Sequence, residues 1–347
     1  MRSNTLLFAI FSAVLFGAAT PASKWLLLDL TPIQLAGLLY LGAAIAVMPA
    51  SFRKGSSSLP SINDRPNQLR LVGAILFGGI FGPVLLMLGL SLAQAGAVSL
   101  WLNLELAATA IIGVLFFRDH LSVSAWVGVV IAVVAAALLS LSQTGSEWIA
   151  GLLVLLACLM WGIDNHLTAM IDGITPSQST FWKGLVAGIV NLSIGISLDP
   201  ITLEFTTIFG ALLVGALSYG LSIVLYIKAS QDMGATRAQV IFSSAPFFGL
   251  ILSAIFLNEL ISTVHIAAGG LFIVAIAFLM RDNHAHHHIH NTSRHKHSHR
   301  HDDGHHNHTH EGLSPSVKHS HFHDHESMEH AHPHWPDLHH RHDHDSH

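Results

Sequence analysis

A single acidic residue, Glu105, stands near the middle of a long apolar run at residues 97–117. A charged carboxylate at that depth in a bilayer costs on the order of several kcal/mol unless it is protonated, paired or hydrated. Because acids in such positions commonly serve substrate or proton pathways, Glu105 is the leading functional candidate. The competing interpretation is a hydrogen-bonded glutamate that only holds helices together.

A second polar group interrupts the apolar run at residues 148–170, where Asp164, Asn165 and His166 are consecutive. Successive helical residues point about 100° apart, so the three side chains cannot all face one cavity. Asp164 and Thr168 share a helix face, and we place His166 towards the cytoplasmic interface. The predicted substrate or proton pathway comprises Glu105, Asp164, Asn165, Tyr219 and Asn191.

Histidine dominates the end of the chain, where residues 282–347 hold 25 of the 28 histidines. Neutral imidazole is a good ligand for zinc, nickel, cobalt and copper. Low complexity and polarity predict that this tail is disordered when free. We expect it to bind transition metals, although no cofactor is required. Its candidate metal ligands are His286, His288, His290, His295, His297, His299, His301, His319, His321, His323, His325, His340, His342 and His344.

The sequence lacks the signatures of several enzyme and binding classes. A metalloprotease needs His-Glu-x-x-His, and the nearest run, residues 325–330, is one residue too long. There is no Gly-rich phosphate loop, and no basic patch suggests a nucleic-acid partner. Cys158 is the only cysteine, so it cannot form a disulfide or a cysteine-based zinc site within one chain. We therefore expect a protein that is not an enzyme.

Ten apolar runs of about bilayer-spanning length must position these residues, since a spanning helix needs roughly 20 apolar residues. Residues 1–281 carry eleven Lys/Arg and eleven Asp/Glu, whereas the tail carries five and ten and accounts for the net charge of -5. Continuous apolar runs argue against a β-barrel, whose strands alternate. We predict an all-α integral membrane fold with spans at 6–28, 32–49, 69–92, 97–117, 123–141, 148–170, 180–198, 206–227, 236–257 and 263–280.

Lysine and arginine are distributed unevenly between the loops. With the N-terminus inside, nine of the eleven in residues 1–281 collect on the cytoplasmic side, and the opposite loops contain none. The other two, Lys24 and Lys183, lie near helix ends, where long side chains can reach the interface. Both termini are therefore predicted to be cytoplasmic.

The chain also repeats itself. Leu30-Thr31-Pro32 before the second span corresponds to Ile174-Thr175-Pro176 before the seventh, and residues 96–122 correspond to residues 234–262. Five helices per copy is an odd number, so the copies cross the membrane in opposite senses, as in many transporters. The predicted units are two inverted five-helix repeats at 1–141 and 148–281 and the disordered tail at 282–347.

These paired blocks, with Phe16-Gly17 and Trp161-Gly162 in the two halves, resemble the drug/metabolite transporter superfamily, specifically proteins with two EamA domains. Residues 102–105, 163–168 and 332–340 are similar to a bacterial subgroup with His-rich tails. The resemblance covers residues 1–281. It implies ten helices, cytoplasmic termini, a bacterial inner membrane and transport of small metabolites. Glu105 lies near the position where the family often has proline, while Pro246 is retained in the second half.

Together these observations predict a secondary transporter that moves a small metabolite or amino-acid-like solute across a lipid bilayer by alternating access. We favour export, coupled to a proton gradient through Glu105. Two alternatives stay open: an exporter of divalent zinc, nickel or cobalt with the tail as collector, and a membrane-anchored metal sensor or buffer. Substrate, direction, coupling ion and oligomeric state, including a homodimer, are left open by the sequence.

Overall fold

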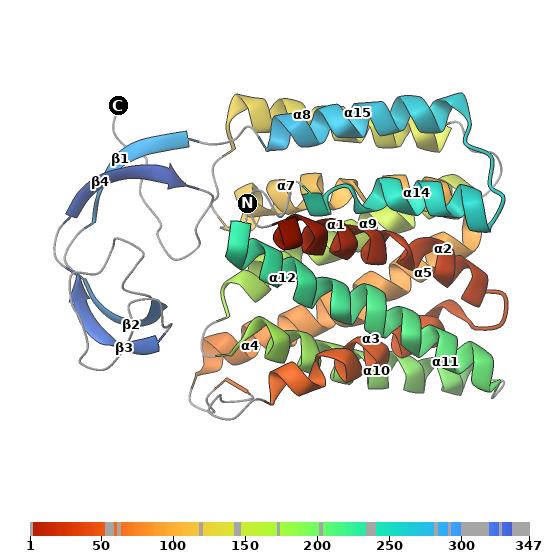
Figure 1. The fold of residues 1–347 in the computed structure, drawn as a ribbon, viewed down its shortest axis with the longest axis horizontal. Helices are drawn as coiled ribbons and strands as arrows, with labels where there is room; N and C mark the ends of the chain where they lie inside the picture. The colour runs from red at the N-terminus through yellow and green to blue at the C-terminus, as the bar shows by residue number, and fades with distance from the viewer. Residues whose placement is uncertain are drawn as a thin grey trace.

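The computed structural model describes residues 3–52, 59–60, 64–117, 121–141, 147–171, 174–200, 204–233 and 241–280, and the tail segments 284–290, 293–299, 319–325 and 328–334. The described body is all-helical (Figure 1). Its first half contains α1 (Ser3–Gly17), α2 (Ala19–Leu26), α3 (Pro32–Ser51), α4 (Arg65–Ala74), the π-helical segment η1 (Ile75–Phe81), α5 (Gly82–Leu92), α6 (Ala95–Trp101), α7 (Leu104–Phe117) and α8 (Val123–Leu141). Its second half contains α9 (Glu147–Ala169), α10 (Pro176–Leu198), α11 (Phe205–Val214), the π-helical segment η2 (Gly215–Leu221), α12 (Ser222–Met233), α14 (Ala245–Phe256) and α15 (Thr263–Leu279).

Eight helical stretches in the described chain are long and apolar enough to cross a bilayer. They follow the first eight predicted spans in order. The ninth predicted span begins among residues 234–240, which lie outside the described residues, and its remainder is the shorter apolar helix α14. The tenth corresponds to α15, also shorter than a full span.

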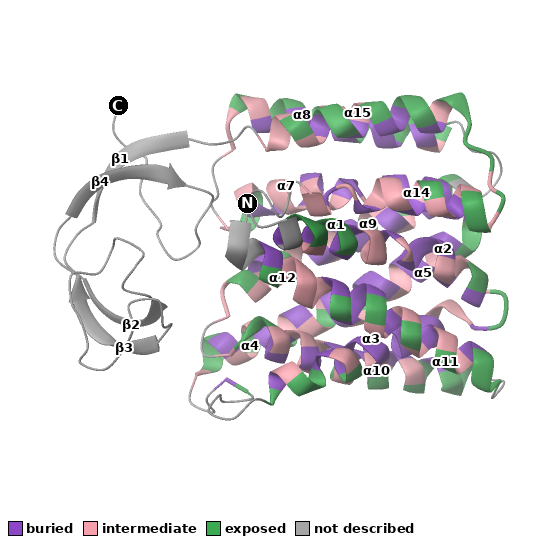
Figure 2. Ribbon diagram, in the orientation of Figure 1, coloured by how far each residue is buried: buried purple, intermediate pink, exposed green. Residues whose placement is uncertain are grey.

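The outer face of the helix bundle is apolar where α8 and α15 lie side by side along one edge (Figures 1 and 2). Val130 and Val133 of α8 and Ile266 and Ile273 of α15 are exposed. Such a surface is unfavourable in water but matches hydrocarbon chains. It is the surface expected of a multi-pass membrane protein.

Helices α3 and α10 form an antiparallel pair that links the two halves of the chain. Each begins with a capping box made by a threonine and the glutamine three residues later. The glutamine amides also reach across the pair. Gln34 Nε2 donates to the Asp199 carbonyl at 2.7 Å, and Gln178 Nε2 donates to the Ser51 carbonyl at 3.0 Å. Each helix start is therefore tied to the end of the other helix.

Two glycines let α10 approach α3 closely. A Cβ at Gly184 would lie 2.7 Å from the Tyr40 carbonyl oxygen, and one at Gly188 would lie 2.9 Å from the Leu41 backbone nitrogen. Glycines four residues apart are a common signature of close helix approach, and here the partner helix is α3.

The described tail segments form short strands. They are β1 (His284–His290), β2 (Ser293–His299), β3 (His319–His325) and β4 (Met328–His334). β1 pairs antiparallel with β4, placing His286 opposite His332, and β2 pairs antiparallel with β3, placing His297 opposite His321.

The expectation of a wholly disordered tail differs from the structure in these four segments. Histidine at every second position is a period-two pattern, which is also the period of a β-strand. The prediction of disorder used low complexity and did not take this period-two pattern into account. Of the predicted metal ligands, His301, His340, His342 and His344 lie outside the described residues.

Candidate functional site

Glu105 occupies the first turn of a half-helix. The apolar stretch Ala95–Phe117 is divided into α6 and α7, and Glu105 is the second residue of α7. In the second half of the chain, Pro246 is likewise the second residue of α14, which follows a turn. The acid and the proline noted in the sequence thus hold the same place in two half-helices. An acid in a first helical turn interacts favourably with the helix dipole.

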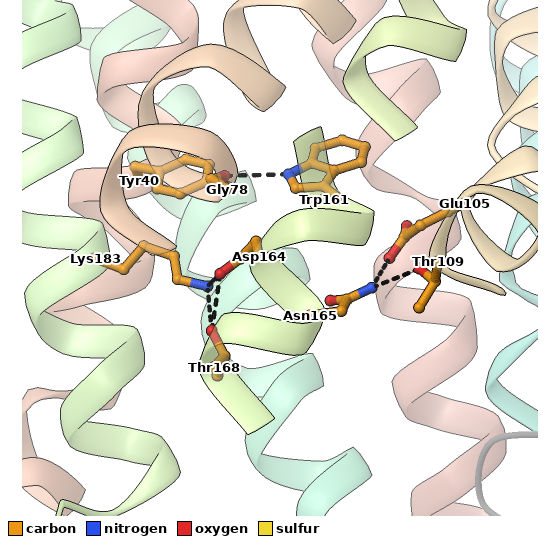
Figure 3. Close-up of polar contacts among 9 residues, drawn as sticks. All are labelled: Tyr40, Gly78, Glu105, Thr109, Trp161, Asp164, Asn165, Thr168 and Lys183. Carbon is orange, nitrogen blue, oxygen red and sulfur yellow. Dashed lines mark hydrogen bonds and ion pairs between the residues drawn. The ribbon is translucent and has the colours of Figure 1, made fainter. Parts of the chain in front are cut away.

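The carboxylate of Glu105 has a neutral partner. Its Oε1 accepts a hydrogen bond from Asn165 Nδ2 at 3.1 Å, and the same amide donates to Thr109 Oγ1 at 3.2 Å (Figure 3). Glu105 is half-buried, and Asn165 is exposed. Within the described residues no lysine, arginine or histidine forms an ion pair with Glu105.

Asp164 instead has a full counter-charge. Lys183 Nζ donates to both of its carboxylate oxygens, at 2.6 and 2.5 Å, and Thr168 Oγ1 donates to Oδ1 at 2.8 Å (Figure 3). The Lys183 and Asp164 side chains are only 16% and 8% exposed. The shared face predicted for Asp164 and Thr168 is confirmed. The prediction that Lys183 reaches the interface is wrong, because the buried carboxylate holds its ammonium inside the bundle.

His166 is buried rather than directed to an aqueous interface. Its ring stacks on Phe117 with centroids 4.5 Å apart, and its Nδ1 lies 2.8 Å from the Gly162 carbonyl oxygen. The apolar stacking surface offered by α7 explains why the predicted interfacial position is not adopted.

The π-helical segment η1 carries a carbonyl without a helical donor. The Gly82 N–H bonds to the Phe77 carbonyl, so it does not serve Gly78. Pro83, the next residue that could donate to Gly78, has no N–H. The Gly78 carbonyl instead accepts from Tyr40 Oη at 2.6 Å and from Trp161 Nε1 at 3.1 Å (Figure 3). The widened turn thereby locks two aromatic side chains from α3 and α9 in place.

Asn191 supports the same π-helical segment. It is buried, and its Nδ2 lies 3.3 Å from the Gly79 carbonyl and 3.4 Å from the Ile80 carbonyl. Its amide is therefore occupied with η1 backbone. Of the five predicted pathway residues, Asn191 is the one whose contacts in the described structure are explained by packing alone.

Tyr219 of η2 brings the second half of the chain to the site. Its ring lies 5.9 Å from that of Tyr40 and 5.7 Å from that of Phe16, centroid to centroid. Tyr40 in turn donates to the carbonyl of Gly78, which packs directly against Asp164. Glu105 reaches α9 separately, through its bond from Asn165.

The aromatic residues Tyr40, Trp161 and Phe16 were not among the predicted pathway residues. Aromatic side chains in apolar helices usually serve packing, so residue type alone does not single them out. A local signal did exist for two of them, namely the Gly78-Gly79-x-x-Gly82-Pro83 pattern. This pattern indicates an interrupted helix, but it does not show which side chains donate hydrogen bonds to the carbonyl that the interruption leaves free.

Two segments, residues 3–141 and 148–281, each match the EamA-like transporter family. The chain belongs to this family. An uncharacterized transporter of Methanothermobacter thermautotrophicus is 26% identical to this EamA protein over 297 residues, covering 78% of this chain and 84% of the relative. The uncharacterized transporter YdfC of Bacillus subtilis is 23% identical over 297 residues, covering 80% and 92%.

A solved crystal structure of a protein has the same fold, with a TM-score of 0.58 and 15% sequence identity. The alignment covers 80% of this EamA protein and 99% of the solved chain. The resemblance stated from the paired sequence blocks is confirmed. The protein is accordingly a multi-pass membrane protein of a transporter family.

Proposed function

We propose that this EamA protein is a secondary transporter that exports a small organic solute, and that the solute binds beside Glu105. The observation that carries the proposal is a half-buried carboxylate, inside an apolar helical stretch, whose hydrogen-bond partner is a neutral amide. A permanently paired acid could not change partners during a transport cycle, whereas Glu105 is able to do so.

We further propose ten membrane spans arranged as two inverted five-helix repeats in a bacterial inner membrane, with both termini cytoplasmic. Support comes from features that recur between the halves. The π-helical segments start 140 residues apart, at Ile75 and Gly215, and the capping boxes start 144 residues apart, at Thr31 and Thr175. The lysine and arginine distribution supports the orientation.

Alternating access then has an identifiable core and identifiable moving parts. The α3–α10 pair joins the halves through mutual glutamine bonds and is the natural fixed axis. The half-helices α7 and α14 follow breaks in the backbone, where small rotations need few broken hydrogen bonds. In the proposed cycle Glu105 carries a proton in one direction and releases it when the solute binds.

The test is charge movement in proteoliposomes on a solid-supported membrane, with a panel of small metabolites applied at fixed pH gradients. Glu105→Gln keeps the side-chain shape but removes the ionisable proton, and it should abolish solute-dependent currents. The matched control is Glu204→Gln, because Glu204 is exposed ahead of α11 and makes no capping bond. Unchanged currents and pH dependence in Glu105→Gln protein would leave that residue only a packing role.

The tail favours a second candidate role, metal binding that supplies or regulates the carrier. It rests on the 25 histidines of residues 282–347 and on the register that sets histidine opposite histidine in both strand pairs. A divalent-metal exporter and a membrane-anchored sensor or buffer are the two forms of this candidate. The family match covers residues 3–141 and 148–281 and leaves the tail out, so we place the organic solute first.

Side-by-side measurement separates these forms. Full-length protein and protein lacking residues 284–347 would be compared for zinc, nickel, cobalt and copper binding and for metal flux. Loss of metal flux on truncation supports the exporter, whereas binding without flux supports the sensor or buffer. Because unperturbed histidine titrates near pH 6.5, binding by the tail should weaken as the pH falls from about 7 to 5.

A further inference from the structure

The two strand pairs of the tail set histidine opposite histidine (Figure 1). We call β1 with β4 the outer ladder and β2 with β3 the inner ladder. Residues directly opposite each other in an antiparallel pair, and residues two apart along a strand, lie on the same face. Each ladder therefore gathers three cross-strand histidine pairs on one face. The pairs are His284 with His334, His286 with His332 and His288 with His330 in the outer ladder, and His295 with His323, His297 with His321 and His299 with His319 in the inner ladder.

The sequence itself agrees with this register. Apart from His287, the histidines of β1 and β4 stand at even-numbered positions, and those of β2 and β3 stand at odd-numbered positions. The pattern thus changes phase on both arms of the tail, at the same place in the register. Arg294 also stands opposite Asp324, and opposite charges across a strand pair are stabilising. Histidine runs that acted strand by strand would not need the two arms to change phase together.

The spacing of the ladder positions suits a transition-metal ion. Directly opposite residues have Cβ atoms about 5 Å apart, and residues two apart on one strand are about 7 Å apart. Two neighbouring pairs therefore supply four imidazoles from a rectangle of about 5 by 7 Å. Zinc is bound by about four ligands in structural sites, at about 2.0–2.1 Å from each imidazole nitrogen. An all-imidazole set suits zinc, nickel, copper or cobalt better than magnesium or calcium.

We propose that each ladder is one transition-metal site whose ligands come from both of its strands. A bound ion then links two parts of the tail that lie far apart in the chain. The inference rests on the second candidate role proposed above, metal binding by the tail, and goes further in assigning the ligand partners and the number of sites. It adds four ligands that are absent from those expected from the sequence, namely His284, His330, His332 and His334.

Zinc alone is the probe, added to the full-length protein in nanodiscs at about pH 7.5, where unperturbed imidazole is mostly neutral. The purification tag contains no histidine. Bound zinc is counted by elemental analysis after gel filtration, and its affinity is measured by competition with a chelating dye. Three variants each replace three histidines with threonine, which favours strands but offers no imidazole. The β1 variant carries His284→Thr, His286→Thr and His288→Thr, the β4 variant carries His330→Thr, His332→Thr and His334→Thr, and the β2 variant carries His295→Thr, His297→Thr and His299→Thr.

The ladders predict which combinations of variants are additive. The natural protein should hold one zinc ion tightly in each ladder. The β4 variant should lose one ion although the histidines of β1 remain, and the combined β1 and β4 variant should lose no more. The combined β2 and β4 variant removes the same number of histidines but affects both ladders, so it should lose both ions. Zinc affinity of an affected ladder should fall at least about tenfold.

Equal losses in the two combined variants would show that histidines bind by number or in single-strand runs, which overturns the ladders but keeps metal binding by the tail. A β4 variant that keeps both ions would overturn the outer ladder. A natural protein that holds no zinc at micromolar concentration would overturn the inference and the second candidate role together. Thermal unfolding of the membrane body confirms that each variant is folded. Solute-dependent currents through Glu105 are measured without zinc, so a failure of organic-solute transport is a separate result.

Discussion

Replacing Lys183 with methionine tests the buried ion pair that it forms with Asp164. Methionine approximates the length of lysine but removes its charge. The substitution leaves the Asp164 carboxylate with Thr168 as its remaining side-chain donor among the described residues, at 2.8 Å. With the Asp164 side chain only 8% exposed, water can replace little of the lost interaction. Removing one partner of a buried pair costs about 3–5 kcal/mol, because the other charge is left uncompensated.

Combining Asp164→Asn with Lys183→Met tests whether the two buried charges stabilise the protein only as a pair. The double variant removes both charges and retains a neutral side chain that can still bond Thr168. It should lie within about 1–2 kcal/mol of the natural protein, since neutral replacement of a buried pair is often tolerated. The expected coupling energy between the two positions is therefore about 2 kcal/mol or more.

The assay is reversible unfolding of the full-length protein in mixed micelles, followed by tryptophan fluorescence, for both single variants and the double variant. Lys24→Met is the matched control. Lys24 donates to the Leu90 and Ala93 carbonyls at 2.7 and 2.9 Å and is not paired with Asp164. Its effect should be unchanged by Asp164→Asn. A Lys183→Met variant that loses less than about 1 kcal/mol, or strictly additive effects in the double variant, would refute the assignment of this pair as a buried, mutually dependent unit.

Three further predictions concern packing, capping and the tail. Gly78→Ala should lower the free energy of unfolding by about 1–3 kcal/mol in the same assay, because the added Cβ would overlap the Asp164 carboxylate. The control, Gly270→Ala, has open space around the added Cβ and should be neutral or slightly stabilising. Glu259→Gln should lower the free energy of unfolding by about 1–2 kcal/mol. The two carboxylate oxygens accept the backbone N–H groups of Ala95 and Gly96, each at 2.8 Å, whereas an amide has only one acceptor oxygen. Equal stability in equilibrium unfolding would contradict a capping role. Deleting residues 284–347 should leave the unfolding midpoint of the membrane body nearly unchanged, and a large drop would show that the tail packs against it.

The membrane character of the chain could be predicted from the sequence because it depends on local composition. A run of about 20 apolar residues is inserted for its own hydrophobicity, whichever helix it later contacts. The same holds for the helix starts at Thr31 and Thr175, whose capping boxes involve residues only three positions apart. Glu105 also stood out locally, since an acid inside an apolar run is conspicuous without knowledge of its neighbours.

Side-chain partners could not be predicted in this way. The sequence placed Lys183 near a helix end and His166 at the interface, but one is paired with Asp164 and the other is stacked on Phe117. Both outcomes depend on which helices lie side by side. Electrostatic pairing and stacking act over a few ångströms in space, whatever the separation along the chain.

What the sequence by itself determined about this protein is therefore eight of its bilayer-length apolar helices, its match of two halves to one family, and the presence of an acid inside an apolar run. Each of these follows from residues adjacent or nearly adjacent in the chain. Only the tertiary structure decided that Asp164 is neutralised while Glu105 is not, and that Tyr40 and Trp161 complete an interrupted turn at Gly78. Those distinctions arise when α3, α7, α9, α10 and the π-helical segments meet, because the charge left over at a site depends on every helix that faces it.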